Sequence, residues 1–163
     1  MDNDIQGEGA FYFKDGRIYI GKWKDNKMNG YGIFVWPDKK KYYGNYINNL
    51  KEGFGFFYWN NEHKYEGFWK WGKQHKYGIL TGHKENKFGY WIDGKLQSKI
   101  NDDETINFII ETINNVKKTE GIFWISIKYT KIWKTNNWWL FESGYKYKFS
   151  KEANNNHIYW LAE

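Results

Sequence analysis

Two hydrophobic patterns divide the chain into a repeating part, a helical part and a final β-rich part. Up to about residue 95, and again after residue 121, aromatic and aliphatic residues alternate with small or polar ones, which is typical of strands that bury one face. Between these parts an apolar stripe follows the spacing of a helix. The stripe consists of Ile106, Ile109, Ile110, Ile113 and Val116. Acidic residues precede the stripe and two lysines follow it, so we expect a helix over about 103–118.

The first part repeats itself every 23 residues. The second glycines of its Gly-x-Gly pairs are Gly9, Gly32 and Gly55, and the next step of the same length reaches Gly78. A second series, Tyr-x-Gly-x-Trp or Tyr-x-Gly-x-Tyr, keeps the same interval and begins at Tyr19, Tyr42 and Tyr65. Turn material rich in Asn, Asp, Gly and Lys separates the two motifs in each unit. We therefore predict one β-hairpin per unit.

The glycines of these motifs have a structural task. In Tyr-x-Gly-x-Trp the three marked residues share one face of a strand, and we expect a ring from the adjacent hairpin to fill the gap that the glycine leaves. Stacked hairpins bury each other's aromatic faces, so the predicted fold is mainly β: an elongated, single-layer antiparallel sheet of stacked hairpins, then one helix and a small β-rich C-terminal region. The chain enters its first unit halfway, at Gly7, which leaves a candidate open edge. The structural glycines are Gly21, Gly32, Gly44, Gly55, Gly67 and Gly78.

These motifs at this spacing resemble the MORN (membrane occupation and recognition nexus) repeat family. The resemblance covers residues 7–95, with the best copies at 42–59 and 65–80. It departs from the family where Tyr46 replaces the usual Trp and where Asn26 and Asn49 replace the turn glycine. The resemblance implies a non-enzymatic scaffold subunit of a cytoskeletal, ciliary or membrane-associated assembly, with a partner segment bound along the aromatic sheet. Its partner-binding candidates are Tyr19, Trp23, Tyr42, Tyr46, Tyr65 and Trp69.

The remainder of the chain resembles no family that we recognise. We divide the sequence into a repeat array over 1–95, a connection over 96–102 and a region over 103–163. Alternating residues predict strands over 123–129 and 145–149, with a turn at 135–137 and a final strand near the end. This region is either a small α+β domain or a continuation of the sheet with the helix laid against it. We expect the isoleucine stripe to be core, and the alternative is an exposed face for a partner.

The positive charge belongs to the repeats. Residues 1–100 hold 17 Lys and Arg against 11 Asp and Glu, whereas residues 101–163 hold 8 of each. Lysines recur in the loops that join one unit to the next, where they either keep an aromatic sheet soluble or meet anionic headgroups. The alternative function is therefore a peripheral membrane adaptor that binds anionic phospholipids. Its lipid-binding candidates are Lys39, Lys40, Lys41, Lys64, Lys84 and Lys87.

The sequence offers little for catalysis. It has no cysteine, its four histidines have no metal-binding spacing, and each Gly-x-Gly precedes a strand instead of a phosphate-binding helix. We expect no enzyme activity, no cofactor, no metal and no nucleic acid, and we expect other protein subunits as partners. No apolar run is long enough to span a membrane, so a cytoplasmic protein is expected, associated with the cytoskeleton, a cilium or a membrane. The many Lys, Asn and Ile residues suggest an AT-rich genome, either of a single-celled eukaryote (a protist) or of a bacterium.

Overall fold

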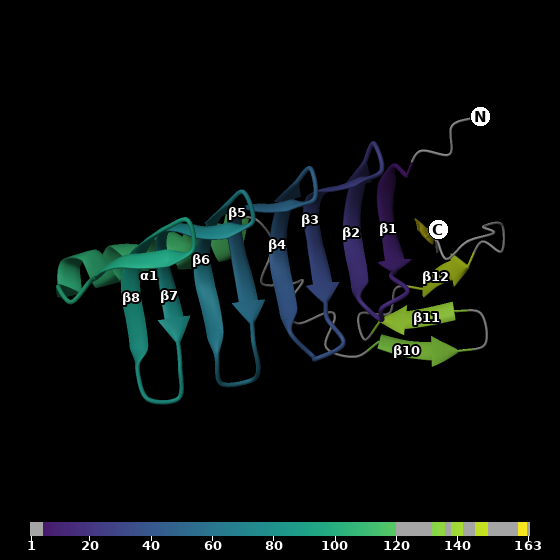
Figure 1. Cartoon of the computed structure of the whole chain (residues 1–163). Coiled ribbons are helices and arrows are strands. Elements are labelled where there is room, and N and C mark those ends of the chain that lie inside the picture. Colours follow the sequence, from purple (N-terminus) through teal and green to yellow (C-terminus); the bar gives the residue numbers. More distant parts are fainter. Residues whose placement is uncertain (1–4, 120–131, 136–137, 142–145, 150–159, 163) are drawn as a thin grey trace.

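A computed structural model describes residues 5–119, 132–135, 138–141, 146–149 and 160–162, with the side chains of residues 5–118. Most of the described chain is one nine-stranded antiparallel sheet whose strands lie side by side in sequence order (Figure 1). The strands are β1 (Gly7–Tyr12), β2 (Ile18–Lys24), β3 (Lys27–Val35), β4 (Lys41–Ile47), β5 (Leu50–Tyr58), β6 (Lys64–Lys70), β7 (Lys73–Thr81), β8 (Asn86–Ile92) and β9 (Lys95–Lys99). The predicted single-layer sheet of stacked hairpins is confirmed.

A line of glycines crosses the sheet. Within the hairpins Gly44 pairs with Gly55 and Gly67 with Gly78, and between the hairpins Gly55 pairs with Gly67. A Cβ atom on Gly67 would lie 2.6 Å from the Tyr65 hydroxyl oxygen and 2.7 Å from the Gly78 Cα. The gap is therefore filled, but by the tyrosine two residues earlier on the same strand. Our expectation of a ring from the adjacent hairpin was wrong, because we did not foresee that the strand bends at its glycine.

The tyrosine hydroxyls form hydrogen bonds at the bend. In each repeat a β-bulge follows the glycine, as between Gly67 and Trp69, and the bulge leaves the residue between them without a partner on the next strand. The Tyr65 hydroxyl donates to the carbonyl oxygen of that residue, Phe68, at 3.2 Å. Tyr19 and Tyr42 make the same bond three residues on, at 3.0 and 3.3 Å. Each tyrosine thus covers the glycine pair and satisfies the carbonyl that the bulge frees.

The rings of one face, which we call the ring face, form a continuous ladder. Each repeat tyrosine stands nearly perpendicular to the Trp or Tyr of its own strand and to that of the next hairpin, an arrangement that aromatic rings favour. Ring centroids lie 5.4 Å apart for Tyr65 and Trp69, and 5.3 Å apart for Tyr42 and Trp69. The buried members of the ring face are Tyr19, Trp23, Phe34, Tyr42, Tyr46, Phe57, Tyr65, Trp69 and Trp91.

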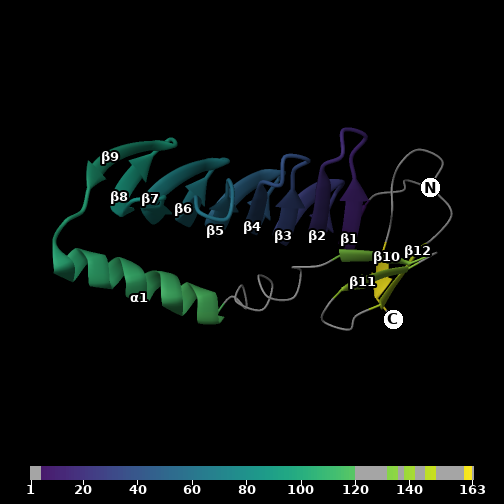
Figure 2. The same ribbon diagram turned by 90° about the horizontal axis from the view of Figure 1, so that it is seen from below.

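The opposite face, the helix face, is covered by α1 (Asp103–Thr119), as Figure 2 shows. Ile109 and Ile113 are buried there, so the prediction that the isoleucine stripe is core is confirmed for these two residues. Asp102 caps the helix, since its carboxylate accepts the Thr105 amide at 2.8 Å, and this bond lowers the pKa of Asp102. The helix matches the range expected from its charges and its spacing. The sheet residues buried in the helix face are Ile33, Tyr43, Phe54 and Phe56.

A second antiparallel sheet follows the helix. Its strands are β10 (Ile132–Thr135), β11 (Trp138–Phe141), β12 (Lys146–Phe149) and β13 (Trp160–Ala162), paired in that order. β12 and β13 agree with two of the predicted strands, whereas the predicted strand over 123–129 lies outside the described residues. β9 occupies residues 96–99, which we had placed in the connection, so only 100–102 join the sheet to α1. The division into domains stays a prediction.

Candidate interaction surfaces

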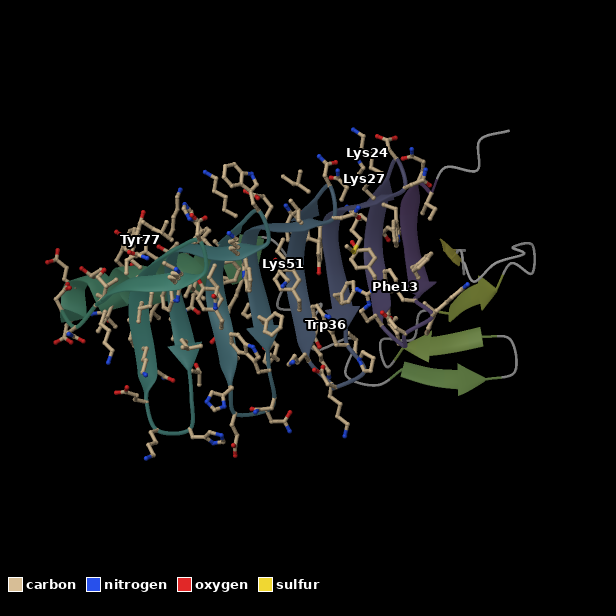
Figure 3. All side chains as sticks on the ribbon, in the orientation of Figure 1. Phe13, Lys24, Lys27, Trp36, Lys51 and Tyr77 are labelled. Carbon is tan, nitrogen blue, oxygen red and sulfur yellow. The ribbon has the colours of Figure 1, made fainter. Side chains whose placement is uncertain are left out.

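The ring face has a buried floor and partly exposed walls. The six partner-binding candidates predicted from the sequence all belong to the floor, since each is at most 9% exposed. Their partly buried neighbours are accessible instead: Phe11, Phe13, Trp36, Trp59 and Leu80. Figure 3 shows Phe13 and Trp36 on the sheet, and Trp36 is the one that lies next to Lys51. A contact of the six candidates with a partner stays a prediction. A partner would first meet the partly exposed residues around them.

Lys51 lies at the centre of this surface inside a box of four rings, which we call the ring box. Its Nζ lies 4.7 Å from the ring centre of Trp69 and 4.8 Å from that of Phe57. The rings of Tyr42 and Trp36 lie at 5.2 and 5.5 Å. All four distances are within the range of cation–π attraction. Among the described residues no carboxylate forms an ion pair with Lys51, and burial lowers the pKa of its ammonium group to about 8.

Lys51 was not among the predicted site residues, because its segment was interpreted as turn material. The 23-residue spacing contains a signal that would have found it. Met28 and Gln74 occupy the equivalent positions in the neighbouring units, and Met28 packs against the ring face. If one repeat has an apolar residue at this position, the same position in the other repeats is expected to face the rings. A lysine at this position therefore places a charge among the rings.

The lysines of the connecting loops, at one edge of the sheet, differ in whether they form ion pairs. Three of the six lipid-binding candidates form ion pairs: Lys40 with Asp38 at 2.7 Å, Lys64 with Glu66 at 2.7 Å, and Lys87 with Glu85 at 3.5 Å. Lys39, Lys41 and Lys84 have no carboxylate partner within the described part of the chain. The loops therefore do not present a uniform row of free charges.

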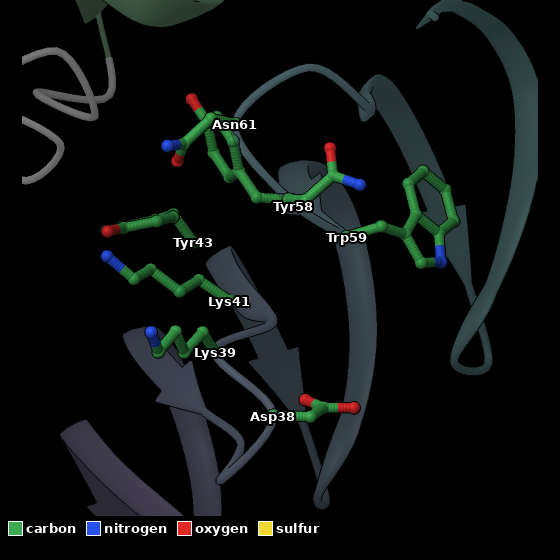
Figure 4. Close-up of a pocket in the computed structure, with 8 residues that line it drawn as sticks. Asp38, Lys39, Lys41, Tyr43, Tyr58, Trp59 and Asn61 are labelled. Atoms are coloured by element: carbon green, nitrogen blue, oxygen red, sulfur yellow. The ribbon is translucent and has the colours of Figure 1, made fainter.

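A cleft of about 540 Å³ opens between the β3–β4 and β5–β6 loops. In Figure 4 the amine ends of Lys39 and Lys41 and the Tyr43 hydroxyl lie on one side of it, with Tyr58 and Asn61 above them. Burial raises the pKa of Tyr43, and it raises that of Tyr58 to about 12. Both hydroxyls thus keep their protons at neutral pH and remain hydrogen-bond donors.

A second cleft between loops holds two histidines. The rings of His63 and His83 lie 4.4 Å apart, and His83 Nδ1 lies 2.5 Å from a carboxylate oxygen of Glu62. No group of three or more His, Cys, Asp and Glu side chains gathers within the described residues, so the pair lacks the ligands for a typical zinc site.

The hairpin tips form the other edge of the sheet. Each tip donates a backbone hydrogen bond to the preceding unit, as from the Gly72 amide to the Lys51 carbonyl at 2.9 Å. Trp71 is 67% exposed here, and the Lys70 ammonium lies 4.6 Å from its ring centre. Further exposed apolar residues at the tips are Ile47, Leu50 and Ile92. Lysines without a carboxylate partner among the described residues accompany them: Lys24, Lys27, Lys70, Lys73 and Lys95.

Comparison with protein families matches the MORN repeat three times in succession, at residues 19–41, 42–64 and 65–86. The chain carries three MORN repeats. Each starts at the tyrosine that covers a glycine pair, and β1, β8 and β9 extend the same sheet beyond the matched residues. MORN repeats generally mediate contacts with proteins or membranes. No curated protein matches the chain, and no helix in its described part is long and apolar enough to cross a membrane.

Proposed function

We propose that this chain is a non-enzymatic scaffold subunit that binds a segment of a partner protein along the ring face. The observation that carries the proposal is the contrast between the two faces of the sheet. α1 covers the helix face with Ile109 and Ile113, whereas the partly exposed rings of the ring face have no such cover among the described residues. Rows of exposed apolar side chains mark interaction surfaces. A cytoskeletal or ciliary assembly is the proposed setting, as the resemblance to MORN proteins implies.

The chemistry of the partner segment follows from Lys51. This ammonium is the centre of the ring face, and no described carboxylate pairs with it. A segment that sets apolar side chains against Trp36 and Trp59 and an acidic side chain opposite Lys51 would fit both features. The acidic residue would supply the charge-assisted hydrogen bond that Lys51 lacks.

Site-specific photo-cross-linking in the native cell tests this proposal. Benzoylphenylalanine in place of Trp59 samples the ring face, and the same group in place of Trp71 samples the hairpin tips as a matched control. We expect a discrete cross-linked protein from position 59, in low and high salt alike, because an apolar contact survives screening. Equal labelling from both positions, or no protein captured at position 59, would exclude the ring face as the binding surface.

The hairpin tips give a second candidate function, attachment to an anionic membrane. Trp71 suits a membrane interface, and the lysines around it lack partners within the described chain. This edge is better suited than the connecting loops, where three of the six predicted lysines are paired. Vesicles of phosphatidylserine test it: tip-mediated binding decreases with salt and with Trp71→Ala, whereas binding that is unchanged by both would contradict it.

A further inference from the structure

The cleft between the β3–β4 and β5–β6 loops brings together donors that the chain leaves unused. Neither the Lys39 and Lys41 ammonium groups nor the Tyr43 and Tyr58 hydroxyls form a side-chain hydrogen bond or ion pair with any described residue, and the same holds for the Asn61 amide. All five groups line one cleft (Figure 4). Buried or half-buried donors normally find acceptors. Tyr43 is buried and Lys41 and Tyr58 are half-buried, whereas Lys39 and Asn61 are exposed at the mouth of the cleft, so all five donors are available to an acceptor from outside the chain.

The acceptors that also line the cleft are already occupied. Asp38 forms an ion pair with Lys40 at 2.7 Å and accepts its backbone amide, and in Figure 4 Asp38 is turned to the other side. The side-chain oxygen of Asn60 accepts the backbone amides of Glu62 and His63. The free charge of the cleft is therefore positive.

A second carboxylate near the cleft is also neutralised. Glu66 on β6 contributes to the raised pKa of Tyr58, so its charge reaches the cleft wall. Its two oxygens are held by Lys64 at 2.7 Å and Lys117 at 2.8 Å. This carboxylate therefore does not supply the missing acceptor.

We propose that this cleft binds a phosphate monoester carried on a phosphorylated side chain of a partner protein. A phosphate monoester carries a charge of about −1.5 to −2 at neutral pH and three acceptor oxygens, which matches two ammonium groups and two hydroxyl donors. A carboxylate or a phosphodiester brings a single charge and leaves donors unpaired. The inference goes beyond the ring-face function and does not depend on it, because the residues involved belong to the loops and to the other face of the sheet.

The surroundings favour a protein partner over a lipid surface. The Lys39 and Lys41 ammonium groups lie at one cleft, whereas three of the four other loop lysines predicted to bind lipid are paired, and carboxylates such as Glu62 and Glu85 share the same edge. A membrane needs a broad cationic face. A single phosphorylated side chain needs only the cleft.

The test uses the whole chain and two matched probes, N-acetyl-O-phosphoserine amide and its unphosphorylated form, titrated by NMR at constant ionic strength. We expect shifts at the cleft with the phosphorylated probe alone. The double variant Lys39→Gln/Lys41→Gln should weaken binding about tenfold or more, which corresponds to the loss of about 1.4 kcal/mol. Lys40→Gln is the matched control in the same loop, and since its charge is already paired it should change binding by no more than about twofold.

Two further variants test the role of the tyrosine hydroxyls, and a second probe tests whether the partner is a protein or a lipid. Tyr43→Phe and Tyr58→Phe remove the hydroxyls while keeping the rings, and each should weaken binding of the phosphorylated probe. Equal binding of both probes, or equal loss in Lys40→Gln, would overturn the phosphate site. If instead vesicles containing a phosphatidylinositol bisphosphate bind the chain through Lys39 and Lys41 while the phosphoserine probe does not, the site stands but its protein partner is wrong.

Discussion

The ammonium nitrogen of Lys51 lies 4.7 Å from the ring centre of Trp69, in the middle of the ring face. The lysine reaches this place from β5, whereas the four rings of the ring box come from β4, β5, β6 and the residue that follows β3. A charge thus occupies a position that holds an apolar methionine, Met28, in the preceding unit. The presence of lysine at this position affects the free energy of unfolding and the pH dependence of that free energy.

Lys51→Met should stabilise the protein at neutral pH. Burial lowers the pKa of Lys51 from its usual 10.5 to about 8, so the charged form is less favourable in the folded chain than in the unfolded one. The shift sets an upper limit of about 3 kcal/mol on the part of the gain that comes from removing the buried charge. We expect a higher midpoint of urea unfolding for Lys51→Met, with Lys73→Met as an exposed control near no change.

The gain should vanish at high pH. Below pH 8 Lys51 is charged in both states and the folded protein bears the full cost, whereas above pH 10.5 it is neutral in both states. The unfolded chain binds more protons between these values, so wild-type stability relative to Lys51→Met rises with pH over this window. A difference between the two proteins that stays constant from pH 7 to 10.5 would contradict the lowered pKa.

Gly67→Val should prevent the repeat array from folding. Its Cβ would lie 2.6 Å from the Tyr65 hydroxyl oxygen and 2.7 Å from the Gly78 Cα, and a backbone atom cannot move aside. Gly44→Val meets the same obstacle at Tyr42 and Gly55. Gly53→Ala is a graded control, because its Cβ meets nothing within 4 Å and only its positive φ of 72° is unfavourable, a cost of about 1 kcal/mol. Circular dichroism and melting would distinguish them, and a Gly67→Val protein with the wild-type melting temperature would refute the glycine line.

The 23-residue period was sufficient to predict the sheet, because each unit has a turn, a small residue and an aromatic residue at the same positions. The helix was equally readable from its isoleucine spacing and terminal charges. The bend at the glycine was not, since Tyr65 covers Gly67 from the same strand only once the bulge at Phe68 is formed. The ring box and the loop cleft also could not be predicted from the sequence, because their residues come from strands and loops that meet only in the folded sheet.

Tyr65→Phe should destabilise the array by about 1 kcal/mol, since it removes one hydrogen bond and leaves the ring in place. The lost bond runs from the hydroxyl to the Phe68 carbonyl at 3.2 Å, and Phe68 has no partner on β7, where the bulge interrupts the pairing. Tyr90→Phe is a control on β8, where the structure shows no equivalent bond. Urea unfolding of both variants measures the difference. Equal loss in both would show that the hydroxyl over the glycine pair does not stabilise the bend.

Lys117→Ala should loosen α1 from the helix face. Lys117 donates to Glu66 at 2.8 Å across the helix–sheet contact, and Lys64 holds the other oxygen of this buried carboxylate. Burial alone would raise the pKa of Glu66, but the two lysines more than offset it, so its pKa is lowered. The pair therefore contributes stability above the usual pKa of 4.5 that is lost as pH falls through the lower folded value. Hydrogen exchange should show faster exchange across α1 in Lys117→Ala at pH 7, while Lys118→Ala, an exposed neighbour, keeps the wild-type rate. If both variants exchange alike, the helix is held by Ile109 and Ile113 alone and the ion pair does not fix its position.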